Sequence, residues 1–255
     1  RIWMMLSGVK LTELPQLTQQ YEEMLKKPLT EEDRHQVKVD LDRSFGNNQE
    51  HLPIKPVLQR VLHASINQGI SYTQGMNYIA LHVLMFCLES DPTNHLAPEQ
   101  VDGKFESLVA AIFVHIIHQL KDIFGENLAN IFNIMAELEQ MLMEIAPEVM
   151  FHIAKFGLDA TVLFAQNYFS LMMYSSPPHS LAKALLDLFL LEGKNAIHAL
   201  LVRMLELTTE RIIATTSAEK LQKFVKFEIF DVCAEKLDEE RKGALCIEDF
   251  GLSFY

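Results

Sequence analysis

The strongest constraint on the fold is the spacing of apolar residues, which recur every three or four positions along most of the chain. We expect the clearest stretches, 106–124, 127–145 and 180–193, to be helices. The last should begin with Ser180 as its cap and end at Gly193. Several of these stretches are apolar around most of their circumference, so they must be buried inside a multi-helix domain. The predicted fold class is all-α.

Few residues break this pattern, because the 255 residues include only 10 Gly and 9 Pro. Two polar, turn-rich segments, 44–56 and 89–103, are predicted loops. Pro147 separates two apolar stretches and marks the predicted seam between an N-terminal lobe, 1–147, and a C-terminal lobe, 148–255. A hydrophobic content of 49% is enough for a continuous core through both lobes.

The charge balance disfavours two classes of partner. The formal net charge is -12, and no run of Lys or Arg is long enough to follow a nucleic acid backbone or an anionic membrane surface. No apolar segment reaches the roughly 18 to 20 residues that span a bilayer, so we expect a soluble protein. The first residue is Arg1, without an initiator Met, and we therefore expect a fragment whose flanks carry further signals.

The cysteines indicate the compartment. There are three, an odd number, and no two form a CxxC pair: Cys87, Cys233 and Cys246. This usage is typical of reduced intracellular thiols rather than of a disulfide framework, and it favours the cytosol.

Two short polar segments stand out from the helical background. In "VKVDLDRSF", residues 37–45, Asp40 and Arg43 are three positions apart and share one face of a helix, so the carboxylate can orient the guanidinium. In "SYTQGMNY", residues 71–78, Gln74 precedes Gly75, whose lack of a Cβ permits a close approach of the backbone. Taken alone, the first is a surface ion pair and the second a turn.

Together these segments resemble the two fingerprints of the TBC domain family, the GTPase-activating proteins of Rab-type small GTPases. The fingerprint IxxDxxR matches residues 37–43, with Val37 in place of Ile, and YxQGM matches residues 72–76. Residues 1–8, "RIWMMLSG", are similar to the family's opening Arg, Trp, Leu and Gly pattern, and residues 185–193 resemble its C-terminal Asp-x-Phe-x-x-Glu-Gly element.

Smaller matches and departures accompany the fingerprints. Ser44 and Phe45 stand where the family has a Thr-Phe pair, and Asn77 continues the second fingerprint as the family does. Tyr168 and Leu186 stand where the family has Trp. Because these two changes remove large aromatic groups, we expect them to affect the packing of the C-terminal lobe rather than the chemistry.

The resemblance implies a two-lobed TBC domain over residues 1–255, with the catalytic side chains in the N-terminal lobe. It implies that Arg43 is an arginine finger and that Gln74 is a glutamine finger, which positions the attacking water. We expect Asp40 to position Arg43, Tyr72 to shape the loop that carries Gln74, and Gly75 to let the backbone approach the GTPase.

The nucleotide is expected to arrive with the partner. The sequence has no GxxxxGK[ST] motif, so the chain should have no cofactor of its own, and the Rab-family GTPase in its GTP-bound form should carry both GTP and Mg²⁺. The chain is then a GTPase activator rather than a self-sufficient enzyme. The expected location is the cytoplasm, with recruitment to membranes through the Rab partner or flanking segments. The sequence specifies neither which Rab is the substrate nor the oligomeric state.

Other functions remain as alternatives. The chief one is a catalytically silent binding module of the same fold that acts in membrane traffic, and a weaker one is a helical scaffold without a GTPase partner. His115, His118 and His82 suggest a metal site, but no HExxH motif accompanies them, and ordinary core or interface histidines are favoured. Residues 238–249 weakly resemble a calcium loop, with Asp249 in place of the terminal Glu, and a solvated turn is favoured. A serine hydrolase is disfavoured because no GxSxG motif is present.

Overall fold

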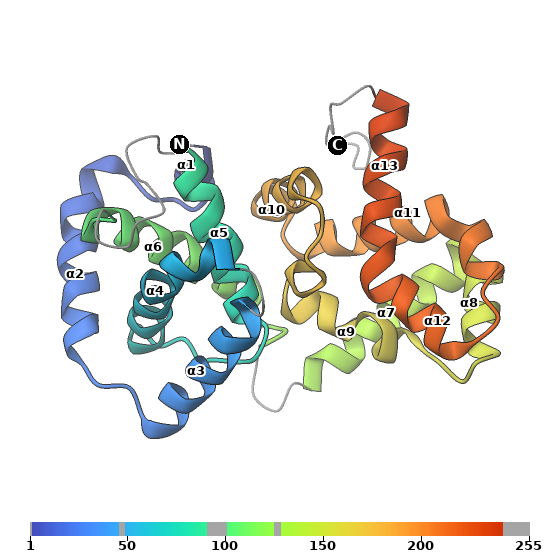
Figure 1. Ribbon diagram of the computed structural model, residues 1–255, viewed down its shortest axis with the longest axis horizontal. Coiled ribbons are helices and arrows are strands. Elements are labelled where there is room, and N and C mark those ends of the chain that lie inside the picture. The colour runs from blue at the N-terminus through green and yellow to red at the C-terminus, as the bar shows by residue number, and fades with distance from the viewer. Residues whose placement is uncertain (1, 46–48, 91–100, 125–128, 242–255) are drawn as a thin grey trace. The chain divides into compact units, whose positions relative to one another are not determined.

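The computed structural model describes residues 2–45, 49–90, 101–124 and 129–241 (Figure 1). Within these ranges every regular element is a helix and no strand is present, which confirms the all-α prediction. Contacts within the chain divide it into two compact units, Arg1–Phe124 and Gly125–Tyr255.

The first unit is built mainly from six α-helices: α1 Ile2–Leu6, α2 Leu14–Lys26, α3 Glu31–Phe45, α4 Lys55–Asn67, α5 Met76–Ser90 and α6 Gly103–Gln119. Helix α6 packs against α2, α4 and α5, while α3 packs against α4 and α5. Nine of the 15 residues of α5 are buried, as expected for a helix that is apolar around most of its circumference.

Helix α3 buries one apolar face. Its residues Val37, Leu41 and Phe45 follow one another at intervals of four, and all three side chains are buried. This spacing places them on one face of the helix, where they pack into the unit. The packing of this face fixes the rotation of α3 about its axis. It therefore also fixes the direction in which Asp40 and Arg43 leave the helix.

A buried polar cluster joins three helices of the first unit. Glu106 of α6 accepts a hydrogen bond of 2.6 Å from the Tyr21 hydroxyl of α2 and two hydrogen bonds, 3.0 and 3.2 Å, from Nε of Arg60 on α4. The Glu106 side chain is 4% exposed and the Arg60 side chain is 39% exposed. Burial and the neighbouring carboxylate raise the pKa of Tyr21 above its ordinary range, so its hydroxyl stays a donor.

The second unit contains seven α-helices within the described residues: α7 Ala129–Ile145, α8 Pro147–Ala154, α9 Ala160–Phe169, α10 His179–Glu192, α11 Lys194–Ile213, α12 Ala218–Lys223 and α13 Ile229–Arg241. A π-helical turn, Phe224–Glu228, connects α12 to α13. Helix α11 packs against α10, α13 and α8, and α7 packs against α8 and α9.

The division between the units differs from the predicted seam at Pro147. Pro147 is the first residue of α8, and the helices on both sides of it, α7 and α8, pack against each other and against α11. Ala146 and Pro147 line an open groove of about 650 Å³ with Arg203 and Glu206 of α11. Proline interrupts a helix locally, but the two helices still share one core, so the division lies before α7.

Helix ends agree only partly with the predictions. Helix α10 begins at His179 after Pro178, so Ser180 lies inside the helix and is not its cap; Gly193, with φ 61°, does end it. Helix α6 begins three residues earlier than predicted because Asp102 caps it, accepting a 2.7 Å hydrogen bond from the Phe105 N–H.

The predicted loops also differ in part. All of the described part of 44–56 is helical, because α3 continues to Phe45 and a 3₁₀ helix, Gln49–Ile54, leads directly into α4. In 89–103 only the ends are described: α5 continues to Ser90, and α6 begins at Gly103. The predicted calcium-like segment 238–249 lies outside the described residues beyond position 241, where α13 ends.

The two positions that lack the family's Trp are well packed in the second unit. Tyr168 of α9 and Leu186 of α10 are both fully buried. The Tyr168 ring meets the His198 ring of α11 edge to face, with centroids 5.5 Å apart. Tyrosine and leucine therefore fill these core positions.

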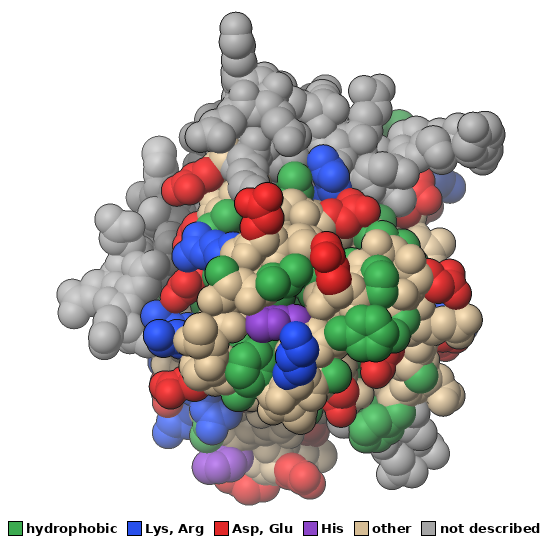
Figure 2. All heavy atoms as spheres, turned by 90° about the vertical axis from the view of Figure 1, so that its right-hand side faces the viewer, with side chains coloured by type: hydrophobic (Ala, Val, Ile, Leu, Met, Phe, Trp, Pro, Cys, Tyr) green, Lys and Arg blue, Asp and Glu red, His purple; other side chains and the backbone are tan. Residues whose placement is uncertain are grey.

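The surface mixes apolar and charged side chains. The face of the second unit near α8 and α12 shows hydrophobic side chains interspersed with acidic and basic ones (Figure 2). Phe151 on α8 is among the most exposed large hydrophobic residues of this unit. None of the helices described is long and apolar enough to cross a membrane.

Candidate functional site

The first fingerprint forms the last turns of α3. Asp40 and Arg43 lie one turn apart, and Nη1 of Arg43 is 3.4 Å from Oδ1 of Asp40. The two side chains differ sharply in exposure, because 58% of Arg43 is accessible to solvent but only 3% of Asp40. The arrangement is a surface guanidinium attached to a buried carboxylate, and not the exposed ion pair that the spacing alone suggests.

Asp40 also contacts the second fingerprint. Its Oδ2 accepts a 3.2 Å hydrogen bond from the hydroxyl of Tyr72, in the segment that precedes α5. Burial raises the pKa of the Asp40 carboxyl above its ordinary value, while the Tyr72 hydrogen bond and the Arg43 charge lower it. Burial and the Asp40 charge raise the pKa of Tyr72, which keeps the phenol protonated as a donor.

Gln74 lies in a tight turn just before α5. Its side chain is exposed, whereas the next residue, Gly75, is buried with φ 110°. That φ lies in a region that L-residues with a Cβ rarely adopt, so the turn requires glycine for its backbone conformation. We expected Gly75 to permit close approach to a partner; the structure supplies a different reason for glycine, because this residue turns the chain into α5.

Asn77, in the first turn of α5, connects the Gln74 turn to the end of α3. Its Oδ1 accepts a 3.0 Å hydrogen bond from the Gly75 N–H, and its Nδ2 donates to Ser44 Oγ at 2.6 Å. The same Nδ2 lies 3.4 Å from the backbone oxygen of Asp40, to which Ser44 Oγ donates at 2.8 Å. Asn77 is buried, so its contacts with Gly75 and with the Asp40 backbone form away from solvent, while the Ser44 hydroxyl is only partly buried.

The structure thus brings all five predicted site residues into one region of the first unit. Asp40 and Arg43 come from α3, while Tyr72, Gln74 and Gly75 come from the turn before α5. The sequence analysis gave no role to Asn77 or Ser44, which link the two segments. A signal was present in the sequence, because Asn77 is an amide at the start of a predominantly apolar helix.

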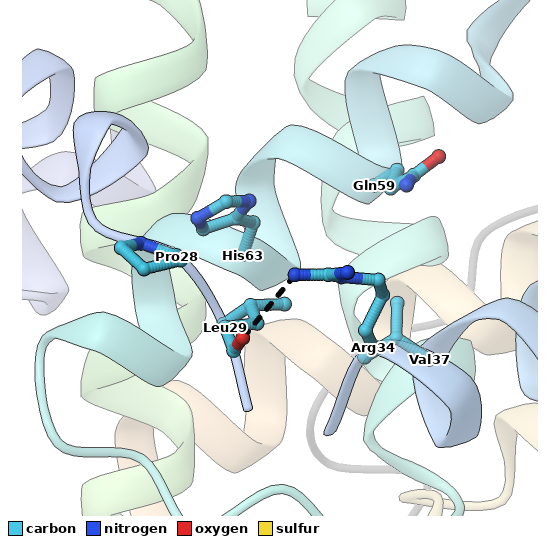
Figure 3. Close-up of a pocket in the computed structure, with 6 residues that line it drawn as sticks. All are labelled: Pro28, Leu29, Arg34, Val37, Gln59 and His63. Carbon is cyan, nitrogen blue, oxygen red and sulfur yellow. Dashed lines mark hydrogen bonds between the residues drawn. The ribbon is translucent and has the colours of Figure 1, made fainter. Parts of the chain in front are cut away.

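A separate cavity of about 130 Å³ lies further toward the N-terminal end of α3 (Figure 3). It is lined by Pro28, Leu29, Arg34, Val37, Gln59 and His63. Nη2 of Arg34 donates a 3.4 Å hydrogen bond to the backbone oxygen of Leu29 across it. Val37, the first residue of the first fingerprint, thus lines this cavity, whereas Asp40 and Arg43 do not.

The histidines considered as metal ligands are placed on helices of the first unit. His115 Nε2 lies 3.0 Å from Nε2 of Gln119, and burial followed by the charge of His118 lowers the pKa of His115. Nδ1 of His82 is 2.9 Å from the backbone oxygen of Tyr78. Within the described part of the chain, no three His, Cys, Asp or Glu residues are grouped so that they could hold a metal ion.

The residues that form this site lie within a match to a known protein family. The model of the Rab-GTPase-TBC domain family matches residues 1–213, which include both fingerprints. The chain belongs to the Rab-GTPase-TBC domain family. The family assignment by the two short fingerprints is therefore confirmed over most of the chain.

The relatives are similar at modest identity. The Rab GTPase-activating protein tbc-11 of Caenorhabditis elegans is 24% identical over 214 residues, which are 81% of this chain and 21% of the relative. The growth hormone-regulated TBC protein 1 of Homo sapiens is 23% identical over 255 residues, or 97% of this chain and 67% of that protein. This chain therefore spans about a fifth of the first relative and two thirds of the second.

Two solved structures share the fold of this TBC domain. The Ypt/Rab-GAP domain of Gyp1p superimposes with a TM-score of 0.68 at 17% identity, covering 92% of this chain and 85% of that one. The Chlamydomonas flagellar RabGAP TBC domain gives the same TM-score at 18% identity, covering 92% and 74%. At this identity the likeness establishes the all-helical TBC fold.

Proposed function

We propose that this chain accelerates GTP hydrolysis on a Rab-family small GTPase in its GTP-bound form, with Arg43 and Gln74 as the catalytic residues. The observation that carries the proposal is the contrast in exposure within the site. Arg43 and Gln74 are exposed, whereas Asp40 and Asn77, which hold the segments that bear them, are buried. The exposed side chains of Arg43 and Gln74 are therefore available to a partner, while buried residues hold the backbone segments that carry them.

Arg43 suits the neutralisation of phosphate charge. GTP hydrolysis is slow when charge developing on the transferred phosphoryl group is poorly stabilised, and an arginine supplied in trans raises the rate by about 10³ to 10⁵. The guanidinium keeps its charge and offers a planar set of donors to phosphate oxygens. Among the described residues Asp40 is the one hydrogen-bond partner of this group, through Nη1 at 3.4 Å, which leaves the other donors to face a nucleotide.

Gln74 suits the positioning of water. Its amide oxygen can accept a hydrogen bond from the attacking water while its nitrogen donates another, so it orients a nucleophile without changing protonation state. The rigid turn at Gly75 restricts where this amide can lie. On this proposal GTP and Mg²⁺ come with the partner, and the chain works in the cytoplasm, reaching membranes through the Rab or through flanking segments.

A second function follows from the same surface. A binding module that recognises a GTPase without activating it needs the fold and the exposed side chains but not the coupling between Arg43 and Gln74. The hydrogen bonds that join the two segments favour the activator, because a surface used only for binding has less need to fix Arg43 and Gln74 relative to each other.

The test is single-turnover hydrolysis across a panel of GTP-loaded Rabs. On a responsive Rab, Arg43→Ala should lose about 10³-fold in rate. Arg43→Lys should recover little of that loss, because an ammonium lacks the planar fork. Gln74→Ala should be slower while still binding the Rab. Arg34→Ala is the matched control, since this arginine has a similarly exposed side chain on the same helix, and it should keep wild-type activity.

The result also separates the two functions. Failure to accelerate any Rab, or full activity in both the Arg43 and the Gln74 variants, overturns the activator proposal. Binding to a GTP-loaded Rab without acceleration supports the silent binding module instead.

A further inference from the structure

The geometry points to Asn77 as a positioning residue that sets the place of Gln74 relative to Arg43. This inference rests on the proposed function, since it concerns the same two catalytic side chains. Asn77 itself is 1% exposed and does not reach a partner. Its role is to hold the turn that carries Gln74 at a fixed position relative to the end of α3, through a contact with Ser44, 33 positions away in sequence.

The contacts fix which way the amide of Asn77 points. The Gly75 N–H can only donate, so the amide atom 3.0 Å from it must be the oxygen. The backbone oxygen of Asp40 can only accept, so the other amide atom, 3.4 Å away, must be the nitrogen. Both ends are thus assigned by chemistry, and only an uncharged amide satisfies the two partners together.

Each end of the amide acts on one catalytic side chain. At one end, the hydrogen bond to Gly75 fixes the peptide that directly follows Gln74, in a turn closed by the 3.2 Å bond from the Met76 N–H to the Thr73 oxygen. At the other end, Ser44 and the Asp40 backbone belong to the helical turn that carries Arg43. Movement of either segment therefore breaks hydrogen bonds of the same buried Asn77 side chain.

The expected consequence is a loss of rate without a loss of binding. A displacement of about 1 Å in a group that positions reactants can cost about 10²-fold in rate. Asn77→Asp preserves the shape but places a carboxylate oxygen beside the Asp40 carbonyl, where repulsion replaces a hydrogen bond. We expect kcat to fall by about 10- to 100-fold, with KM for the Rab within about threefold of wild type.

The decisive experiment is a double-mutant cycle between Asn77 and Gln74. If Asn77 positions Gln74 relative to Arg43, Asn77→Asp should cost clearly less in a Gln74→Ala background than in wild type, because one of the two groups it positions is already gone and only the part that acts through Arg43 remains. A merely structural role would reduce both backgrounds equally. Equal losses in the two backgrounds, a change confined to KM, or an unchanged kcat would each overturn the inference.

Ser44→Ala is a second variant that tests the same contact if Asn77→Asp fails to fold. It removes the hydroxyl that accepts from Asn77 and donates to the Asp40 backbone oxygen, and we expect a loss of about 3- to 10-fold in kcat, again reduced in the Gln74→Ala background. The control is Ser65→Ala, another serine of this unit, whose hydroxyl donates to the Val61 oxygen of its own helix and to no other described residue, and this variant should leave kcat unchanged. A Ser44→Ala variant that behaves like Ser65→Ala contradicts the inference.

These outcomes are distinct from failure of the proposed function. If wild-type protein accelerates no Rab, the activator proposal fails, and the positioning inference falls with it. If wild type is active and the Asn77 and Ser44 variants retain full kcat, only the positioning inference fails.

Discussion

The hydroxyl of Tyr72 donates to Oδ2 of Asp40 across 3.2 Å, although the two residues are 32 positions apart in sequence. The other oxygen of the same carboxylate, Oδ1, faces Arg43. One buried acid is therefore shared between the two fingerprints of the family, and it holds the proposed arginine finger while contacting the segment that carries the proposed glutamine finger.

We predict that Asp40→Asn stabilises the protein at neutral pH while impairing GTPase activation. Burial raises the pKa of Asp40 above its ordinary value of 3.8, so the folded state binds this proton more tightly than the unfolded state. The resulting stability is complete below the ordinary pKa and is lost as pH rises through the folded pKa. At neutral pH the carboxylate is charged at a cost that asparagine does not have. Urea unfolding over a pH series should give a higher free energy of unfolding for the variant than for wild type at neutral pH, and the difference should shrink as pH falls.

The Tyr72→Phe variant tests the same carboxylate by removing a hydrogen bond that stabilises its charged form. Removing the phenolic donor raises the pKa of Asp40 further and should lower stability at neutral pH by about 1.5 to 3 kcal/mol. In the Asp40→Asn background the cost should be smaller, because a neutral amide gains less from the donor than a carboxylate does. A lower urea midpoint for Asp40→Asn than for wild type at neutral pH would show that the Tyr72 hydrogen bond and the Arg43 charge together outweigh burial.

The Glu106 cluster predicts that loss of Arg60 costs much more stability than loss of Arg34. Arg60→Ala leaves the buried Glu106 carboxylate with the Tyr21 hydroxyl as its remaining partner among the hydrogen bonds described above, and it should cost about 3 to 5 kcal/mol. Arg34→Ala removes an exposed i,i+3 pair with Glu31 and should change stability by less than about 1 kcal/mol. Chemical denaturation of both variants checks this, and comparable costs would contradict it.

Arg60→Ala should also behave differently when Glu106 is neutral. In a Glu106→Gln background the cost of Arg60→Ala should fall, because no buried charge is then left unpaired. Below the unfolding temperature, Arg60→Ala should keep wild-type kcat, since the cluster joins α2, α4 and α6 rather than the segments that carry Arg43 and Gln74.

Two buried tyrosines predict opposite responses to the same substitution. The Tyr168 hydroxyl is buried without a hydrogen-bond partner among the described residues, so Tyr168→Phe should stabilise the second unit by about 1 kcal/mol. The Tyr21 hydroxyl bonds Glu106, so Tyr21→Phe should destabilise by about 1.5 to 3 kcal/mol. Thermal and urea unfolding measure both; equal losses would mean that Tyr168 holds a partner such as a buried water.

Much of the site was predictable because its parts are local. Asp40 and Arg43 share a helix face by spacing alone, and Gln74 lies beside a glycine that signals a turn. The start of α10 was mispredicted because Ser180 looks like a cap in sequence, while the Pro178 backbone already begins the helix. The seam was mispredicted because a proline between two helices does not show whether they share a core.

By itself the sequence determined an all-helical chain of the TBC family and named the two side chains proposed to reach the nucleotide, because periodicity and short fingerprints are local properties of the chain. Only the tertiary structure decided that Asp40 is buried, that Tyr72 and Arg43 share it, and that Asn77 joins the Gln74 turn to Ser44. The Tyr72–Asp40 and Asn77–Ser44 contacts link residues more than 30 positions apart, and they exist because α3 packs its apolar edge against α4 and α5. Burial, which sets the pKa of Asp40 and fixes the site, follows from that packing and not from spacing.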